Sequence, residues 1–387
     1  MIKADKDDDF ARQGIGATRP RPAGAIARRS IPRVSRMNHV SHTLWRRLRA
    51  LAGLLLCGWA STAWSQTVEE ISDSRVIRPD VNLHEGEPPV VSAVAISADG
   101  TQLAVAGDDH IVRLWNLSDC SLLYDLKSHT DWVRAVAFDP VTGWLASAGD
   151  DHRIHFWDLK TGRTARTLAD HEQVVNCLGF SPDGSILALA GHGAQIWLYD
   201  GRSGKPLREL EAPGRDVRAL AISPDGRTLA AGGQNGRVRV WNLDDGEVLF
   251  EVTADRLRAR ALAFSPDGTQ LATGGDGRMI HVFDANDGAE IVVLTGPPAK
   301  NLALIYSGDG MLVSGGSDNI VRVWEVAASR QVLRLVGHTG SVTSLAFHTE
   351  TGLLASGSFD TSVRLWNLAG DGRGNVVRQA AKKKYEK

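Results

Sequence analysis

Two short segments that contain carboxylates and histidines are the first candidates for chemistry. Asp108-Asp109-His110 and Asp150-Asp151-His152 have the same order of residues and lie 42 residues apart. Carboxylates and imidazoles are common metal ligands, so the repetition has the form of a duplicated metal-ligand spacing. Both segments, however, fall in polar turns between apolar stretches. We therefore predict no metal site and no cofactor.

No other motif in the chain predicts a reaction. It contains no Gly-x-Ser-x-Gly elbow, no His-Glu-x-x-His pair and no zinc-type pairing of cysteines. Ala231-Gly232-Gly233 and Gly274-Gly275 end apolar stretches and lack the helix and lysine that a phosphate loop needs. We predict no catalytic residues and a protein that is not an enzyme.

The whole chain is organised by one internal repeat. An aromatic residue followed by a polar or acidic one recurs at intervals of 42, 42, 42, 42, 41 and 42 residues. The seven pairs are Trp115-Asn116, Trp157-Asp158, Tyr199-Asp200, Trp241-Asn242, Phe283-Asp284, Trp324-Glu325 and Trp366-Asn367. A fixed period of this length is typical of stacked supersecondary units.

Each repeat is composed of four short apolar segments separated by turns. In the fourth repeat these segments are residues 217–222, 228–232, 237–243 and 247–252. Such lengths, rich in Val, Leu and Ile and bounded by Gly, Pro and Asp, are typical of antiparallel strands. The turn Ser-Pro-Asp-Gly recurs at 181–184, 223–226 and 265–268, and its Pro and Gly favour hairpin loops. The pattern predicts an all-β chain with four strands per unit.

With this period, these aromatic strand ends and its Gly-His openings, the chain resembles the WD-repeat family over residues 84–372. The resemblance implies a seven-bladed β-propeller of four-stranded antiparallel blades, in which the neighbouring blades cover one another's faces. It is specific for the fold and says little about function, because one fold hosts many functions.

The resemblance also implies a hydrogen-bonded set of His, Ser, Asp and Trp in a blade. The second and seventh repeats hold complete sets: His129, Ser147, Asp151 and Trp157, and His338, Ser356, Asp360 and Trp366. The first and sixth repeats have partial sets. Gly193, Asn235 and Gly277 stand at the Asp position of the third to fifth repeats. We expect the turns there to be less stable, by about 0.5–1.5 kcal/mol for each missing hydrogen bond.

Closure of the ring needs a strand for the outer edge of the seventh blade. Residues 76–83, which precede the first repeat, are the favoured candidate, because an edge strand tolerates Pro79. The rival is 375–379. We interpret 66–83 as linker and possible closing strand, and 373–387 as a charged tail.

Aligned repeats place several basic residues and one tryptophan on one rim. The predicted partner-binding residues are Trp132, Arg134, Arg218, Arg258, Arg260 and Lys300. We expect Trp132 to be an exposed anchor and the cations to attract an acidic protein or peptide. In the alternative interpretation, Trp132 caps the neighbouring blade and the cations are ordinary solvated side chains.

The first 65 residues differ in charge from the rest of the chain. They hold 12 Lys+Arg and 4 Asp+Glu, a balance of +8, so a net charge of −1 for the whole chain leaves −9 for residues 66–387. That excess of carboxylates disfavours nucleic-acid binding. Basic residues before an apolar run at 50–60 and a small-residue exit at 63–65 have the order of an export signal. We expect Met37 to be the true start and the mature chain to lack a membrane span.

These features predict a monomeric, non-enzymatic interaction scaffold, periplasmic or secreted, in a bacterial cell envelope. Two alternatives remain. One is a propeller enzyme or metal-dependent hydrolase that uses the central channel. It is disfavoured because the first strands of the repeats, such as residues 92–96 and 260–264, are small and apolar. The other is a cytoplasmic regulatory scaffold, which follows if the signal is not used.

Overall fold

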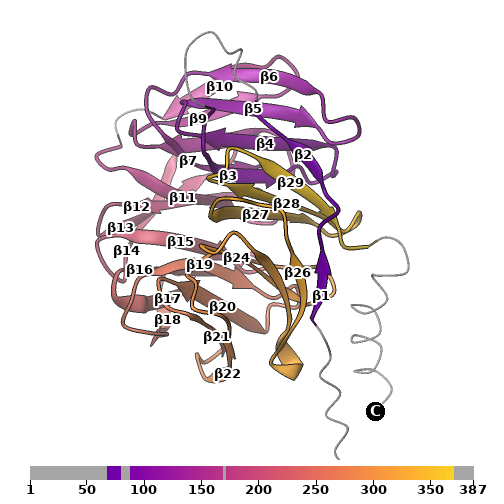
Figure 1. Ribbon diagram of the computed structural model, residues 1–387. Helices are drawn as coiled ribbons and strands as arrows, with labels where there is room; N and C mark the ends of the chain where they lie inside the picture. The colour runs from indigo at the N-terminus through magenta and orange to yellow at the C-terminus, as the bar shows by residue number, and fades with distance from the viewer. Residues whose placement is uncertain (1–67, 80–87, 169–170, 370–387) are drawn as a thin grey trace, which may run out of the picture. The chain divides into compact units, whose positions relative to one another are not determined.

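The repeats form a ring of β-sheets in the computed structural model, which describes residues 68–79, 88–168 and 171–369. The described strands form seven sheets, each built mainly of antiparallel strands (Figure 1). The first strands of successive blades contact one another around a closed cycle, β3 to β7, β11, β15, β19, β23, β27 and back to β3. The prediction of a seven-bladed propeller is therefore confirmed.

Four consecutive strands form each of the first five blades. Blade one is β3 (Val91–Ile96), β4 (Gln102–Gly107), β5 (Ile111–Asn116) and β6 (Leu122–Lys127); blade two is β7 (Val133–Phe138), β8 (Leu145–Gly149), β9 (Ile154–Asp158) and β10 (Arg163–Leu168); blade three is β11 (Val175–Phe180), β12 (Ile186–Gly191), β13 (Gln195–Asp200) and β14 (Pro206–Glu211). Blade four is β15 (Val217–Ile222), β16 (Thr228–Gly233), β17 (Arg237–Asn242) and β18 (Val248–Thr253); blade five is β19 (Ala259–Phe264), β20 (Gln270–Gly275), β21 (Met279–Asp284) and β22 (Glu290–Thr295).

The last two blades each include a strand from before the first repeat. Blade six is β23 (Asn301–Tyr306), β24 (Leu312–Gly316), β25 (Val321–Glu325) and β26 (Arg330–Leu335), with β1 (Glu69–Ile71) added at its outer edge. Blade seven is β27 (Val342–His348), β28 (Leu353–Ser358) and β29 (Val363–Asn367), with β2 (Arg75–Ile77) as its outer strand. The described helices are two single 3₁₀ turns, η1 (Gln234–Gly236) and η2 (Val326–Ala328), and neither is long and apolar enough to cross a membrane.

The second strand of each blade explains why the blades must stack. Residues Leu187, Ala188, Leu189 and Ala190 of β12 are all 0% exposed, although successive side chains of a strand point to opposite faces. Both faces of the sheet are therefore covered. A core cluster accordingly joins Ala146 and Phe156 of blade two to Val175 and Leu187 of blade three.

The ring closes through the segment that precedes the first repeat. β2 pairs antiparallel with β29, and Ile77 enters the core that blade one and blade seven share. This strand overlaps only the start of the expected segment 76–83. Pro79 lies beyond its last paired residue, and residues 80–87 and the rival 375–379 lie outside the described residues. Thr343 strengthens the closure, because its hydroxyl donates to the Val91 carbonyl over 2.7 Å.

Blade six differs from the expectation of four strands. β1 pairs with β26 in parallel, with Glu70 opposite Arg334, and the two side chains form an ion pair of 3.4 Å. The stretch before the first repeat thus supplies outer strands to two neighbouring blades. The sequence interpretation missed β1, because three residues are too few to produce a strand pattern.

Candidate functional site at the mouth of the central channel

Every blade begins with a β-bulge that turns one side chain toward the mouth of the channel. The pairing of the first with the second strand shifts register after its first residue in all seven blades. A bulge of this kind re-aims the unpaired residue. The seven bulged residues are Ser92, Arg134, Asn176, Arg218, Arg260, Leu302 and Thr343. All of them line one cavity of about 480 Å³, together with Trp132, Lys300 and Phe359.

Of the six predicted partner-binding residues, five therefore line the same cavity. Arg134, Arg218 and Arg260 come from the first strands of blades two, four and five. Trp132 and Lys300 come from the loops before blades two and six. Arg258 is not among the lining residues, and its Nη2 donates to Asp216 over 2.9 Å.

The cations at this mouth form ion pairs with carboxylates of the protein itself. Arg134 donates from Nε to Asp150 over 2.8 Å and from Nη2 to the same carboxylate over 2.5 Å. Arg260 makes the equivalent contact with Asp276, with an Nε distance of 2.6 Å. Lys300 reaches Asp276 as well, over 3.1 Å.

Burial alone would raise the pKa of Asp276. The hydrogen bonds from Arg260 and Lys300 outweigh that effect and lower it. Close to Asp276, whose amide donates to the Arg258 carbonyl, Asp216 accepts from Arg218 Nε over 2.7 Å and also from Arg258 Nη2. Five cations thus share three carboxylates, which leaves a local charge of 5 − 3 = +2.

Aromatic side chains stand on the rim of the cavity. Trp132 is half-buried, because the Arg134 guanidinium covers its ring at 4.2 Å from the centroid. The sequence had predicted an exposed anchor. Phe359, which the sequence analysis overlooked, is 49% exposed and lines the same cavity. It could have been found, because the other six repeats have a polar residue at its position.

The two complete hydrogen-bonded sets lie inside their blades, away from this cavity. In blade two, His129 contacts Asp151 through Nδ1 over 2.7 Å and Ser147 through Nε2 over 2.7 Å, and Trp157 Nε1 donates to Ser147 over 2.8 Å. A carboxylate can only accept, so Nδ1 carries the proton and Nε2 accepts from Ser147.

Blade seven repeats this arrangement. Its distances are 2.9 Å from His338 to Asp360, 2.7 Å from His338 to Ser356 and 2.9 Å from Trp366 to Ser356. In both blades the imidazole connects the loop before the first strand to the turn after the second. The sets therefore stabilise the loops and turns that carry the rim residues of these two blades.

Other blades fill the missing positions of the set with local substitutes. Blades one and six have the aspartate of the set but no histidine to pair with it. The aspartate pairs instead with a buried arginine four residues later, Asp109 with Arg113 and Asp318 with Arg322. In blade three, His171 Nε2 contacts the Tyr199 hydroxyl over 2.7 Å.

The two glycines at the Asp position have a steric cause. A Cβ on Gly193 would lie 1.3 Å from Gln173 Oε1, and one on Gly277 would lie 1.8 Å from Asp255 Oδ2. A side chain from the preceding loop thus occupies the space that the aspartate takes in other blades. Whether these turns are looser stays a prediction.

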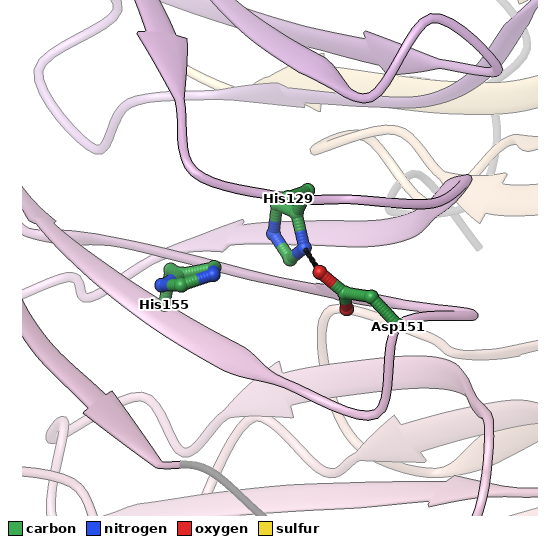
Figure 2. A group of neighbouring side chains, drawn as sticks. All are labelled: His129, Asp151 and His155. Atoms are coloured by element: carbon green, nitrogen blue, oxygen red, sulfur yellow. Dashed lines mark hydrogen bonds and ion pairs between the residues drawn. The ribbon is translucent and has the colours of Figure 1, made fainter.

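One group of side chains in blade two has the composition of a metal site. Figure 2 shows His129, Asp151 and His155, whose ligand atoms all lie within 4.8 Å of one another. Both ring nitrogens of His129 are already hydrogen-bonded, so a metal ion would have to break that set. His155 Nδ1 and the Thr167 hydroxyl share a hydrogen bond of 2.9 Å, and the buried Nε2 of His155 has no partner among the described residues.

The repeated Asp-Asp-His segments do not form a joint site either. Asp108 accepts from the Val90 amide over 2.9 Å, while Asp150 holds Arg134 as described. His110 and His152 occupy left-handed turn positions with φ of 66° and 61°. The acidic side chains of both segments are thus engaged in turns and ion pairs.

The two cysteines that follow the predicted export signal are free thiols. Burial raises the pKa of Cys177 to about 12, so its thiol stays protonated at neutral pH. Its sulfur lies 3.5 Å from the Ala190 carbonyl of the adjacent strand.

Comparisons with known proteins match most of the repeat region. Residues 81–116 and 329–367 match the model of the WD domain, G-beta repeat. Residues 130–326 match the Nucleolar protein 10-like, N-terminal domain. A curated relative, "Cell division cycle 20.1, cofactor of APC complex" of Arabidopsis thaliana, is 29% identical over 124 residues, which covers 27% of this chain and 27% of that relative.

Proposed function

Because the chain belongs to the WD-repeat β-propellers of the Nucleolar protein 10-like family, we propose that it is a non-enzymatic interaction scaffold that binds an acidic segment of a partner protein at the mouth of its central channel. One observation carries the proposal. Seven bulged residues from seven blades converge on one cavity whose surroundings have a local excess of positive charge. A rigid ring presents these residues with little loss of conformational entropy on binding.

The ion pairs leave the cations able to accept a second anion. Arg134 and Arg260 use Nε and Nη2 for their aspartates, and Nη1 of each has no hydrogen bond within the described part of the chain. A carboxylate of the partner would bridge such groups, as Asp216 already bridges Arg218 and Arg258. The aspartates orient the guanidinium groups, and Phe359 offers an apolar contact beside them.

The channel-mouth proposal predicts charge-dependent binding of an acidic peptide. A fluorescein-labelled peptide of glutamates around one leucine should bind the propeller, and Arg260→Gln with Lys300→Gln should raise its Kd about tenfold, or about 1.4 kcal/mol. Fluorescence anisotropy would measure this in low salt, and added salt should weaken the binding.

The matched control is Lys127→Gln, which removes a 65% exposed cation from the outer strand β6 of blade one. This variant should bind like the unaltered protein. Equal affinities for the double variant and the control would refute the channel mouth as the acidic-peptide site.

We also propose that the protein is exported to the periplasm or beyond and acts there as a monomer. The support is the order of basic, apolar and small residues before Ser65, which lies outside the described residues. Fractionation of cells should recover the propeller outside the cytoplasm, with a native N-terminus after residue 65. A cytoplasmic pool of chains that retain residues 37–65 would contradict export and favour the cytoplasmic scaffold.

A further inference from the structure

A cross-strand ion pair between the third and fourth strands recurs in this propeller. In blade four, Arg239 stands opposite Glu251 and its Nε donates to that carboxylate over 2.7 Å. In blade one, Arg113 stands opposite Asp125 at 3.6 Å. The arginine side chains are only 16% and 5% exposed, and Arg239 also contacts the preceding blade, where its Nη1 donates to the Glu211 carbonyl over 3.0 Å.

Blade three keeps the acid of this pair but not the cation. Glu209 of β14 occupies the equivalent position and stands opposite Trp197 of β13. It is exposed, and it forms no ion pair or hydrogen bond with any residue in the described ranges. The basic neighbour Arg208 turns the other way, because its Nη2 donates to the Asp244 carbonyl of blade four over 3.3 Å.

A cavity of about 660 Å³ lies in the place of the missing arginine, between β10 of blade two and β13 and β14 of blade three. Trp197, Tyr199, Gln173, Glu172 and Glu209 line it. The Oε1 of Gln173 is buried against Gly193 and is not offered to the groove. Burial and the nearby Glu209 carboxylate both raise the pKa of Tyr199.

Glu172 and Glu209 are exposed lining groups of this groove that form no ion pair in the described ranges. Arg208 and His171 also line it. Arg208 donates from Nη2 to blade four, although its buried Nη1 has no partner among the described residues, and His171 contacts the Tyr199 hydroxyl and the Trp197 ring. Cations favour the faces of aromatic rings. The groove therefore has the opposite electrostatic character to the channel mouth.

We infer that this interblade groove binds an arginine side chain of a partner protein, with the guanidinium stacked on Trp197 and paired with Glu209. Blades one and four hold the same guanidinium internally, in blade four through the equivalent acid and in blade one through Asp109 together with the equivalent acid. Arginine fits better than lysine because its planar fork can stack and donate two hydrogen bonds at once. The chain itself stacks Arg134 on Trp132 at 4.2 Å. This second site does not depend on the proposed acidic-peptide site.

A small probe tests the groove directly. Titration of the full chain with Nα-acetyl-arginine amide, followed by NMR, should shift the indole N–H signal of Trp197, which is identified by its absence in Trp197→Arg. Nα-acetyl-citrulline amide has nearly the same shape without the charge and should bind at least tenfold more weakly. Trp197→Arg supplies the internal cation of blades one and four, so it should abolish binding and keep the fold.

Matched substitutions on one strand complete the experiment. Glu209→Gln should weaken binding of the arginine probe at least tenfold, whereas Glu211→Gln, two residues along β14 and outside the groove, should leave it unchanged. The inference is overturned if the probe causes no shift of Trp197, if citrulline binds equally well, or if the two glutamate variants behave alike. Circular dichroism of each variant verifies that the sheets are intact, and binding at the channel mouth serves as the independent check.

Discussion

Replacement of Trp157 by Ala should lower the free energy of unfolding by about 3–5 kcal/mol. The side chain is 1% exposed and packs in the core that blade one and blade two share. Its Nε1 also donates to Ser147, which in turn holds His129. The substitution therefore opens a large cavity and removes a donor from the hydrogen-bonded set. Urea denaturation followed by circular dichroism would measure the loss.

Two further variants separate the causes of this effect. Trp157→Phe keeps most of the apolar volume and loses the hydrogen bond. It should lower the free energy of unfolding by only about 1–2 kcal/mol, which covers the lost bond and the altered shape. Trp132→Ala, at the half-buried rim, should cost less than about 1 kcal/mol. A rim substitution as costly as the core one would show that Trp132 has a structural role in joining blades.

Acidification should destabilise the propeller through a histidine that is neutral in the folded state. Burial lowers the pKa of His155 from its ordinary value of 6.5 to about 4. The unfolded chain therefore binds a proton between these values that the folded chain does not bind. The stability is fully present above about pH 6.5 and declines as the pH falls toward 4, by up to about 3 kcal/mol.

The test compares denaturation curves at about pH 7 and pH 4.5. His155→Phe should remove most of the difference, because the phenyl ring cannot take up a proton and the imidazole Nε2 has no partner to lose among the described residues. Some dependence should remain, since burial also lowers the pKa of His171. If His155→Phe retains the full effect, another group is responsible for the acid sensitivity.

The two proposed sites would let one ring hold partners of opposite charge. The channel mouth is basic, although residues 66–387 carry a net charge of −9, and the groove at Trp197 is acidic. They lie on different parts of blade three, because Asn176 of the inner strand β11 belongs to the mouth and Glu209 of the outer strand β14 to the groove. One partner with basic and acidic segments could occupy both.

The order of residues by itself determined the architecture. Aromatic strand ends at a near-constant interval define equivalent positions in every unit. These positions identify the blades, and the resemblance to the WD-repeat family adds the members of the hydrogen-bonded sets and the rim that they imply. This works because a repeat fold places equivalent residues in equivalent surroundings. Trp157 and Trp366 lie in equivalent hydrogen-bonded sets for that reason.

Only the tertiary structure decided which of the equivalent residues have partners. Asp216 forms ion pairs with both Arg218 and Arg258, and Arg258 belongs to the loop before the next blade, about one repeat later in the chain. The parallel addition of β1 to blade six and the empty place beside Glu209 likewise depend on contacts between segments far apart in sequence. The repeat period identifies equivalent residues in the seven units. Ion pairs and cavities depend instead on which residues of neighbouring blades come into contact when the blades stack.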